Sequence, residues 1–176
     1  FCSDKQHFEI IENSNKVIIY PMRFTKLYVN FFIDEILSIK SKKNENENEK
    51  LNILYLHSKI FGNINSDEIK RMFKIFNKYK NLNIVIKKHP RGGYRELKKL
   101  FNIKNYLISE KHPIELMLIN NYIICVQSIS IIDALILNKI VIVPTYFSLN
   151  IFDPSILKYC LVINSPDELL INLEKI

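Results

Sequence analysis

A basic turn near the middle of the chain combines three side chains that are suited to binding a phosphate. Lys87, His89 and Arg91 follow directly after the apolar run 84–86. An ammonium supplies charge, a guanidinium makes bidentate contacts, and an imidazole donates a hydrogen bond or carries a proton. Pro90 stiffens the turn between them. The pattern predicts a phosphate or diphosphate site, and a solvated basic loop is the alternative.

A second polar segment follows the apolar run 122–126. It contains Ser128 and Ser130, which lead into a predicted helix. The start of a helix offers hydroxyls and backbone N–H groups at the positive end of its dipole. Asp133 lies on the same helix, where it either faces the ribose hydroxyls of a ligand or complements the dipole. This segment predicts a second part of the anion site, although a plain helix cap would use the same serines.

Two further histidines follow similar patterns. His57 and Ser58 come directly after the apolar run 51–56, so we expect them at the ligand edge or in a polar loop. His112 repeats the His-Pro dipeptide, but Pro113 suits the first turn of a helix. We therefore predict a structural role for His112.

Short, continuously apolar runs alternate with amphipathic stretches over residues 51–176. Such runs are typical of a parallel sheet that is covered on both faces. The sequence therefore predicts a doubly wound, Rossmann-like α/β domain at 51–176, after an N-terminal extension and polar linker at 1–50. The predicted strands are 16–20, 51–56, 82–87, 106–108, 122–126, 140–143 and 161–163. The predicted helices are 23–40, 67–79 with Ser66 as its cap, 95–101, 113–119, 128–137 and one that opens at Ser165-Pro166.

This fold predicts where the polar segments meet. The carboxyl ends of parallel strands lie at one edge of the sheet, and ligands of open α/β sheets bind at that edge. We therefore expect the residues after runs 51–56, 84–86 and 122–126 to lie close together.

Composition limits the class of protein. The 176 residues are 48% apolar, which excludes a mainly disordered chain and allows one domain with a core. The net charge of +7 would suit nucleic acid, an acidic membrane surface or a phosphorylated ligand. No nucleic-acid motif accompanies the charge, so we expect no nucleic-acid partner. Three widely spaced cysteines predict neither a zinc site nor a disulfide framework, and Cys125 is expected in the core.

The sequence also predicts a location. It contains neither a signal peptide nor an apolar run long enough to span a bilayer, so we expect a cytoplasmic protein. Its basic charge would allow peripheral contact with the inner face of the membrane. Because the chain begins with Phe1 rather than methionine, we expect it to be part of a longer protein.

The spacing of these motifs resembles the C-terminal half of GT-B-type bacterial transferases that build surface polysaccharides. The resemblance extends to CDP-glycerol glycerophosphotransferases and to sialyl- or polysialyltransferase-like groups. It rests on a strand ending in Lys-x-His-Pro, then Ser-x-x-x-x-Asp-Ala, then Asn-Lys before another strand. The matching residues are Lys87, His89, Pro90, Ser128, Asp133, Ala134, Leu135, Leu137, Asn138 and Lys139. Arg91 and the later Pro113-Ile114-Glu115-Leu116 resemble the sialyltransferase-like groups most.

The resemblance implies a function. It implies a domain that binds a nucleotide-activated sugar donor, with a CMP-linked, sialic-acid-like sugar as the favoured donor. The alternatives are a glycerophosphotransferase that uses CDP-glycerol and a UDP-GlcNAc 2-epimerase-like enzyme. It also implies that His89 contacts the donor phosphate and assists nucleotide departure, that Ser128 binds phosphate, and that no cofactor or metal is needed. A glycan or lipid-linked acceptor would bind a separate N-terminal domain. A non-catalytic nucleotide-binding module is the remaining alternative.

Overall fold

The fold is taken from a computed structural model of the chain. It describes residues 30, 31, 33, 34, 51–57, 65–89, 106–125, 128–147 and 154–173. The chain divides into two compact units, 1–43 and 44–176, which are treated separately. In the first unit the four described residues are helical, within the predicted helix 23–40. The predicted strand 16–20, linker 41–50 and helix 95–101 lie outside the described residues.

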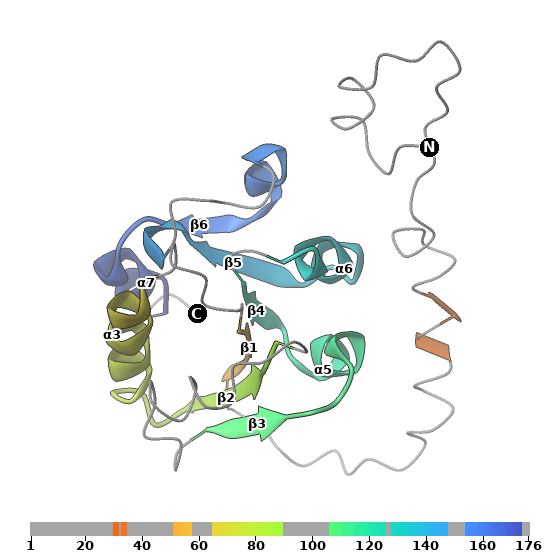
Figure 1. The fold of residues 1–176 in the computed structure, drawn as a ribbon, viewed down its shortest axis with the longest axis horizontal. Helices are drawn as coiled ribbons and strands as arrows, with labels where there is room; N and C mark the ends of the chain where they lie inside the picture. Colours follow the sequence, from red (N-terminus) through yellow and green to blue (C-terminus); the bar gives the residue numbers. More distant parts are fainter. Residues whose placement is uncertain are drawn as a thin grey trace. The chain divides into compact units, whose positions relative to one another are not determined.

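Six parallel strands form one sheet in the second unit (Figure 1). The strand order is β3-β2-β1-β4-β5-β6, and every pair of neighbours is parallel. This order confirms the predicted doubly wound α/β fold. The strands are β1 (Leu51–Leu56), β2 (Leu82–Lys87), β3 (Leu107–Ser109), β4 (Tyr122–Ile124), β5 (Ile140–Pro144) and β6 (Leu161–Ile163).

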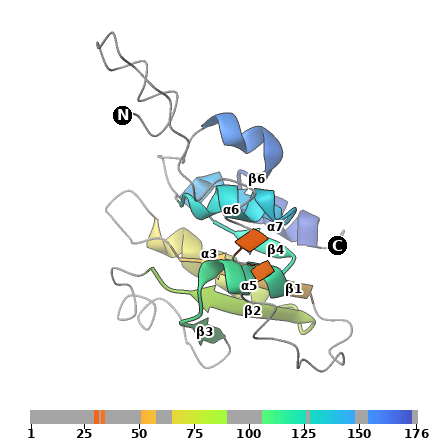
Figure 2. The same ribbon diagram turned by 90° about the vertical axis from the view of Figure 1, so that its right-hand side faces the viewer.

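Helices cover both faces of this sheet, as Figures 1 and 2 show. One face carries α3 (Ser66–Phe76) and α7 (Pro166–Leu173), and the other carries α5 (Pro113–Ile119) and α6 (Ser130–Ile136). Two 3-10 turns, η3 (Thr145–Phe147) and η4 (Pro154–Tyr159), were not predicted from the sequence. Because each strand is covered on both sides, its residues are apolar at successive positions rather than at alternate ones.

The core therefore consists of two apolar layers, one on each side of the sheet. The layer under α3 and α7 includes Ile53, Tyr55, Phe73 and Phe76. The layer under α5 and α6 includes Leu54, and Cys125 is fully buried there, as predicted. Full burial of a large aliphatic or aromatic side chain contributes roughly 1.5–3 kcal/mol. Because the two layers hold the strands in place, they also determine the position of the sheet edge at which the polar segments end.

The start of α3 differs from the prediction. The N-cap is Asn65 rather than Ser66, and the Asn65 side chain accepts hydrogen bonds from the backbone N–H groups of Asp67 (3.0 Å) and Glu68 (3.4 Å). The backbone N–H of Asn65 donates to the carbonyl oxygen of Phe147 in η3 at 2.8 Å. Both residue types are good caps, and this tertiary contact places Asn65 at the cap position.

This assignment predicts unequal effects for two neighbouring substitutions. We expect Asn65→Ala to lower the free energy of unfolding by about 1 kcal/mol, because two N–H groups at the start of α3 lose their acceptor. Ser66→Ala should change it by less than roughly 0.5 kcal/mol. Urea unfolding of both variants measures the difference, and equal losses would contradict the assignment.

Helix α6 is shorter than predicted. It begins at Ser130, and the cap position is held by Ile129 without a side-chain hydrogen bond. Ser128 lies before the helix, where its hydroxyl accepts a hydrogen bond from the backbone N–H of Ser130 at 3.2 Å. The helix is followed by Asn138 in the left-handed region (φ 53°), a conformation that asparagine tolerates well. Ser128 is therefore a turn residue at the ligand edge rather than a residue of the helix.

The remaining helix starts agree with the predictions. His112 is the N-cap of α5, and its Nδ1 accepts from the N–H of Ile114 at 3.3 Å. Ser165 caps α7 by accepting from the N–H of Glu168 at 3.2 Å. The structural role predicted for His112 is thus confirmed. Strand β4 ends at Ile124: Cys125, which was also predicted in it, lies after the strand, and Val126 lies outside the described residues.

Candidate functional site

The strand order places a topological switch point between β1 and β4. From β1 the chain continues outward to β2 and β3, and then crosses back to β4 on the other side of β1. Helical connections diverge at such a switch point, and ligands bind beyond the carboxyl ends of the strands there. His57 follows β1, His89 follows β2 by two residues, and Ser128 follows β4 by four. The predicted polar segments therefore end at one edge of three adjacent strands.

His57 is the most enclosed of these residues. It is 3% exposed, and its backbone N–H donates to the carbonyl oxygen of Lys87 at 2.9 Å, which continues the β1–β2 pairing by one residue. Its ring nitrogen Nδ1 lies 3.2 Å from the hydroxyl oxygen of Tyr55. Its other ring nitrogen, Nε2, is buried and has no hydrogen-bond partner among the described residues. Buried polar atoms are rarely unpaired, so the lack of a partner for this nitrogen calls for an explanation.

Burial keeps the His57 ring neutral. Burial, which leaves the charged form poorly solvated, and the nearby His89 together lower the pKa of His57 to about 4, with burial as the larger cause. His57 is therefore uncharged at neutral pH and acts through hydrogen bonding. The effect of His89 also places the two histidines in one electrostatic environment.

This lowered pKa predicts a loss of stability in acid. In the unfolded chain His57 takes up a proton as the pH falls below about 6.5, whereas the folded protein does so only near pH 4. Stability is thus lost as the pH falls through this window, by about 1.4 kcal/mol per pH unit and about 2–3 kcal/mol in total. Urea unfolding between pH 7.5 and 4.5 should show a smaller loss in His57→Gln. Equal pH dependence in both proteins would contradict the prediction.

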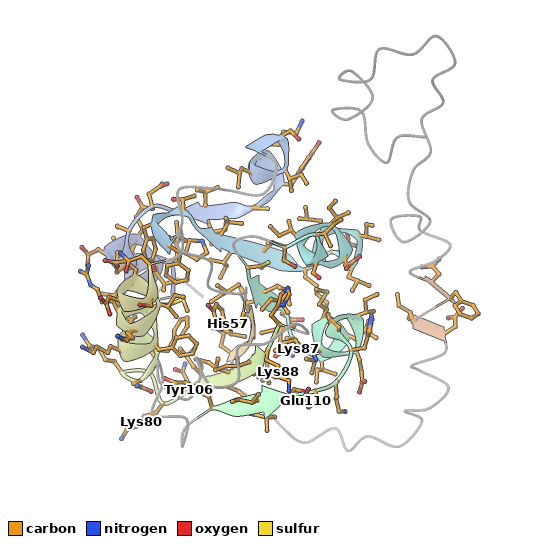
Figure 3. All side chains as sticks on the ribbon, in the orientation of Figure 1. His57, Lys80, Lys87, Lys88, Tyr106 and Glu110 are labelled. Atoms are coloured by element: carbon orange, nitrogen blue, oxygen red, sulfur yellow. The ribbon has the colours of Figure 1, made fainter. Side chains whose placement is uncertain are left out.

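The two lysines at the end of β2 are held by Glu110, which follows β3 (Figure 3). The Lys87 ammonium donates to the backbone carbonyl of Glu110 at 3.0 Å, and the Lys88 ammonium pairs with the Glu110 carboxylate. An ammonium has three N–H donors, so one bond leaves Lys87 able to contact a phosphate. These contacts hold Lys87 and Lys88 against Glu110, the residue that follows β3.

The segment after β4 contributes one accessible and two buried groups. Ser128 is half-buried, whereas Ser130 is 7% exposed and Asp133 is 0% exposed. Both buried residues have interaction partners within the protein. Ser128 is consequently the hydroxyl of this segment that a ligand reaches most directly. A contact between Asp133 and ribose hydroxyls stays a prediction.

Three predicted site residues, Ser58, Pro90 and Arg91, lie outside the described residues. The described site therefore ends at His57 after β1 and at His89 after β2.

Sequence reasoning missed three residues that line this edge. Tyr55 bonds to His57, while the hydroxyl of Tyr146 and one carboxylate oxygen of Glu68 are buried and have no hydrogen-bond partner within the ranges that the structure describes. Burial raises the pKa of Tyr146, and the nearby Glu68 adds to the rise, so these two groups are close. One signal was present in the sequence: Tyr55 precedes His57 by two residues in a strand, so both side chains point to the same face.

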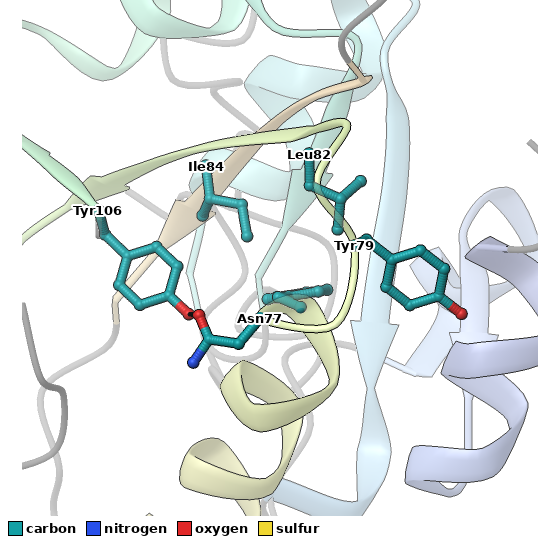
Figure 4. A pocket seen from close by; sticks show the side chains of 6 residues that line it. Asn77, Tyr79, Leu82, Ile84 and Tyr106 are labelled. Carbon is teal, nitrogen blue, oxygen red and sulfur yellow. Dashed lines mark hydrogen bonds between the residues drawn. The ribbon is translucent and has the colours of Figure 1, made fainter.

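A small pocket lies elsewhere in the domain (Figure 4). It has a volume of about 170 Å³ and is lined by residues that include Asn77, Leu82 and Tyr106. The Tyr106 hydroxyl bonds to the Asn77 side chain across its mouth. Because Leu82 begins β2 and Lys87 ends it, this pocket is at the opposite edge of the sheet from the candidate site.

Within the described ranges, no group of three His, Cys, Asp or Glu side chains is placed to hold a metal ion. None of the helices in the described part of the chain has the length and hydrophobicity to cross a bilayer.

The sheet order and the helices on both faces define a Rossmann-like domain, and GT-B-type structures share it. One is the UDP-GlcNAc 2-epimerase from Neisseria meningitidis bound to UDP-GlcNAc (TM-score 0.61, 17% identity, 95% of this chain and 48% of that chain). Another is the wall teichoic acid polymerase TagF with CDPG (TM-score 0.54, 17% identity, 96% and 44%). A third is MnaA from S. aureus with UDP (TM-score 0.51, 15% identity, 90% and 50%).

These similarities establish the fold. The chain spans about half the length of the structures it resembles. No protein-family model matches the sequence, and a search of curated proteins finds no match.

Proposed function

We propose that this chain is the donor-binding half of a GT-B-type glycosyltransferase that uses a nucleotide-activated sugar. The observation that carries the proposal is the convergence of His57, His89 and Ser128 at the carboxyl edge of three adjacent strands. Nucleotide phosphates bind at this position of doubly wound sheets. The similar structures with UDP-GlcNAc, CDPG and UDP support the same ligand class.

The residues of the site would have different chemical roles. Lys87 and Arg91 would supply positive charge to the phosphates of the departing nucleotide, and Ser128 a hydroxyl. His57 would contribute a neutral hydrogen bond, and His89 would bind phosphate or deliver a proton as the nucleotide leaves. Groups placed in advance around developing negative charge lower the barrier to its departure. No metal or further cofactor enters this scheme.

The proposal also concerns which nucleotide the donor carries. The likeness of Arg91 and the segment 113–116 to sialyltransferase-like groups favours a CMP-linked, sialic-acid-like donor. The structural similarity to TagF with CDPG favours CDP-glycerol. The acceptor, a glycan or a lipid-linked precursor, would bind outside this chain. A cytoplasmic enzyme in peripheral contact with the inner face of the membrane fits such an acceptor.

Isothermal titration of the 176-residue chain with CMP, CDP and UDP tests the proposal. We expect micromolar to millimolar affinity for at least one of them, and weaker binding of AMP at the same concentration. The preferred nucleotide then separates the donor classes. The proposal is wrong if none of the three binds.

A UDP-GlcNAc 2-epimerase is the second candidate, because the similar structure with a TM-score of 0.61 is such an enzyme. Preference for UDP over CMP and CDP would favour it. Conversion of UDP-GlcNAc into its C2 epimer by the protein without an acceptor would then distinguish epimerase chemistry from transfer.

A further inference from the structure

Tyr55 and His57 form a rigid pair at the end of β1. Their rings lie 5.7 Å apart, and the Tyr55 hydroxyl is 3.2 Å from Nδ1 of His57. Tyr55 is 2% exposed, and its ring makes an edge contact with Phe73 at 5.3 Å. Because Tyr55 is held by the core, it can fix the orientation of the histidine that follows it.

The position of the hydroxyl proton follows from the same contacts. Burial raises the pKa of Tyr55, and the nearby Cys125 and Tyr146 add to the rise, so the hydroxyl keeps its proton. Nδ1 of His57 is the hydrogen-bond partner that the described residues give this hydroxyl. If Tyr55 accepted rather than donated, its own proton would be buried without an acceptor, which is unfavourable. The Tyr55 hydroxyl therefore donates to Nδ1.

This bond decides the tautomer of His57. A neutral imidazole carries one proton, and when Nδ1 accepts a hydrogen bond the proton is on Nε2. Nε2 is the buried atom without a partner, on the side of the ring away from Nδ1. The site thus contains a buried N–H donor to which the described part of the chain gives no acceptor.

We propose that His57 donates a hydrogen bond from Nε2 to a phosphate oxygen of the nucleotide-activated donor, and that Tyr55 is the positioning residue that fixes this tautomer. The inference rests on the proposed function, and it assigns the His57 interaction to one atom. A phosphate oxygen is the natural acceptor, because it takes a hydrogen bond from a neutral donor without requiring a further charge.

The surroundings explain why a neutral donor is useful here. The titratable groups that act on this pair are His89 after β2, Cys125 directly after β4 and Tyr146 in η3, and Glu68 of α3 lies close to Tyr146. Burial and His89 lower the pKa of His57 to about 4. His57 therefore keeps one protonation state across the neutral range, and its contribution to binding should not change there.

Two substitutions of His57 test which ring nitrogen matters. The amide nitrogen of Gln lies close to the position of Nε2, whereas that of Asn lies closer to Nδ1. We expect His57→Gln to bind the preferred nucleotide within about threefold of the wild-type protein, and His57→Asn to bind it at least about tenfold more weakly. Calorimetry with CMP, CDP and UDP measures both.

Tyr55→Phe tests the positioning role, because it removes the hydroxyl and keeps the ring. Nitrogen-15 NMR of the free wild-type protein should show His57 with a protonated Nε2 and an unprotonated Nδ1 between pH 6 and 8. In Tyr55→Phe we expect a mixture of the two tautomers and binding about three- to tenfold weaker. A purely structural role for Tyr55 would leave the ring nitrogen signals unchanged.

The outcomes of these experiments distinguish failure of the inference from failure of the proposed function. If the wild-type protein binds none of the three nucleotides, the proposed function fails and the inference fails with it. If the wild-type protein binds but His57→Asn and His57→Gln bind equally well, the inference alone is wrong. A wild-type His57 protonated on Nδ1 would also overturn it, with or without nucleotide binding. Should Tyr55→Phe fail to fold, the two His57 variants and the wild-type spectrum still decide.

Discussion

His89→Ala should weaken binding of the preferred nucleotide by about 10- to 100-fold, or roughly 1.4–2.8 kcal/mol. A hydrogen bond between a side chain and a charged phosphate has about this value when its removal leaves the ligand group unpaired. His89 follows β2 at the switch point, and its electrostatic effect on His57 places it in the candidate site. Calorimetry with CMP, CDP and UDP, together with thermal unfolding, measures the effect on binding and on stability.

The chain contains a matched control for this substitution. His112 is also followed by proline, but it caps α5 through a hydrogen bond to the N–H of Ile114. We expect His112→Ala to leave nucleotide affinity unchanged and to lower the free energy of unfolding by about 0.5–1 kcal/mol. If both histidine variants lost affinity equally, the loss would reflect damage to the domain, and the role of His89 would be refuted.

Phe73→Ala should lower the free energy of unfolding by about 3–5 kcal/mol. Phe73 is 3% exposed and makes edge contacts with Phe76 at 5.5 Å, with Tyr55 at 5.3 Å and with Tyr106 at 4.9 Å. The substitution removes these contacts and leaves a cavity beneath α3. Because Tyr55 loses its support, we also expect weaker nucleotide binding in the fraction that stays folded. Urea unfolding gives the stability, and calorimetry at 10 °C gives the affinity.

Two control substitutions show whether the loss comes from the packing of Phe73 or from a general sensitivity of the protein to substitution. Phe73→Leu keeps an apolar side chain at the same site and should cost about 1–2 kcal/mol. Leu107→Ala removes a side chain that is 64% exposed and should cost less than roughly 0.5 kcal/mol. A loss below 1 kcal/mol for Phe73→Ala would show that α3 is not packed as described.

The sequence predicted the strands well, because each buried strand carries a continuous apolar run. The runs 51–56 and 82–87 became β1 and β2 with the same bounds, and 161–163 became β6. Periodicity and turn residues are local properties, so they could be recognised without neighbours. The cap of α3 could not be assigned in this way, because Asn65 and Ser66 are both good caps and adjacent. A hydrogen bond from Asn65 to Phe147, far away in the sequence, decides between them.

For the candidate site, too, some features follow from the sequence and others follow only from the tertiary structure. The sequence by itself determined that His57, His89 and Ser128 follow apolar strands, and hence that a parallel sheet would gather them at one edge. Only the tertiary structure decided which strands are neighbours, since the order β2-β1-β4 depends on long-range pairing. It also decided the burial and charge of His57 and its bond to Tyr55, because burial results from packing by helices that follow later in the chain. Packing thus makes His57 a neutral donor, and the sequence alone could not show this.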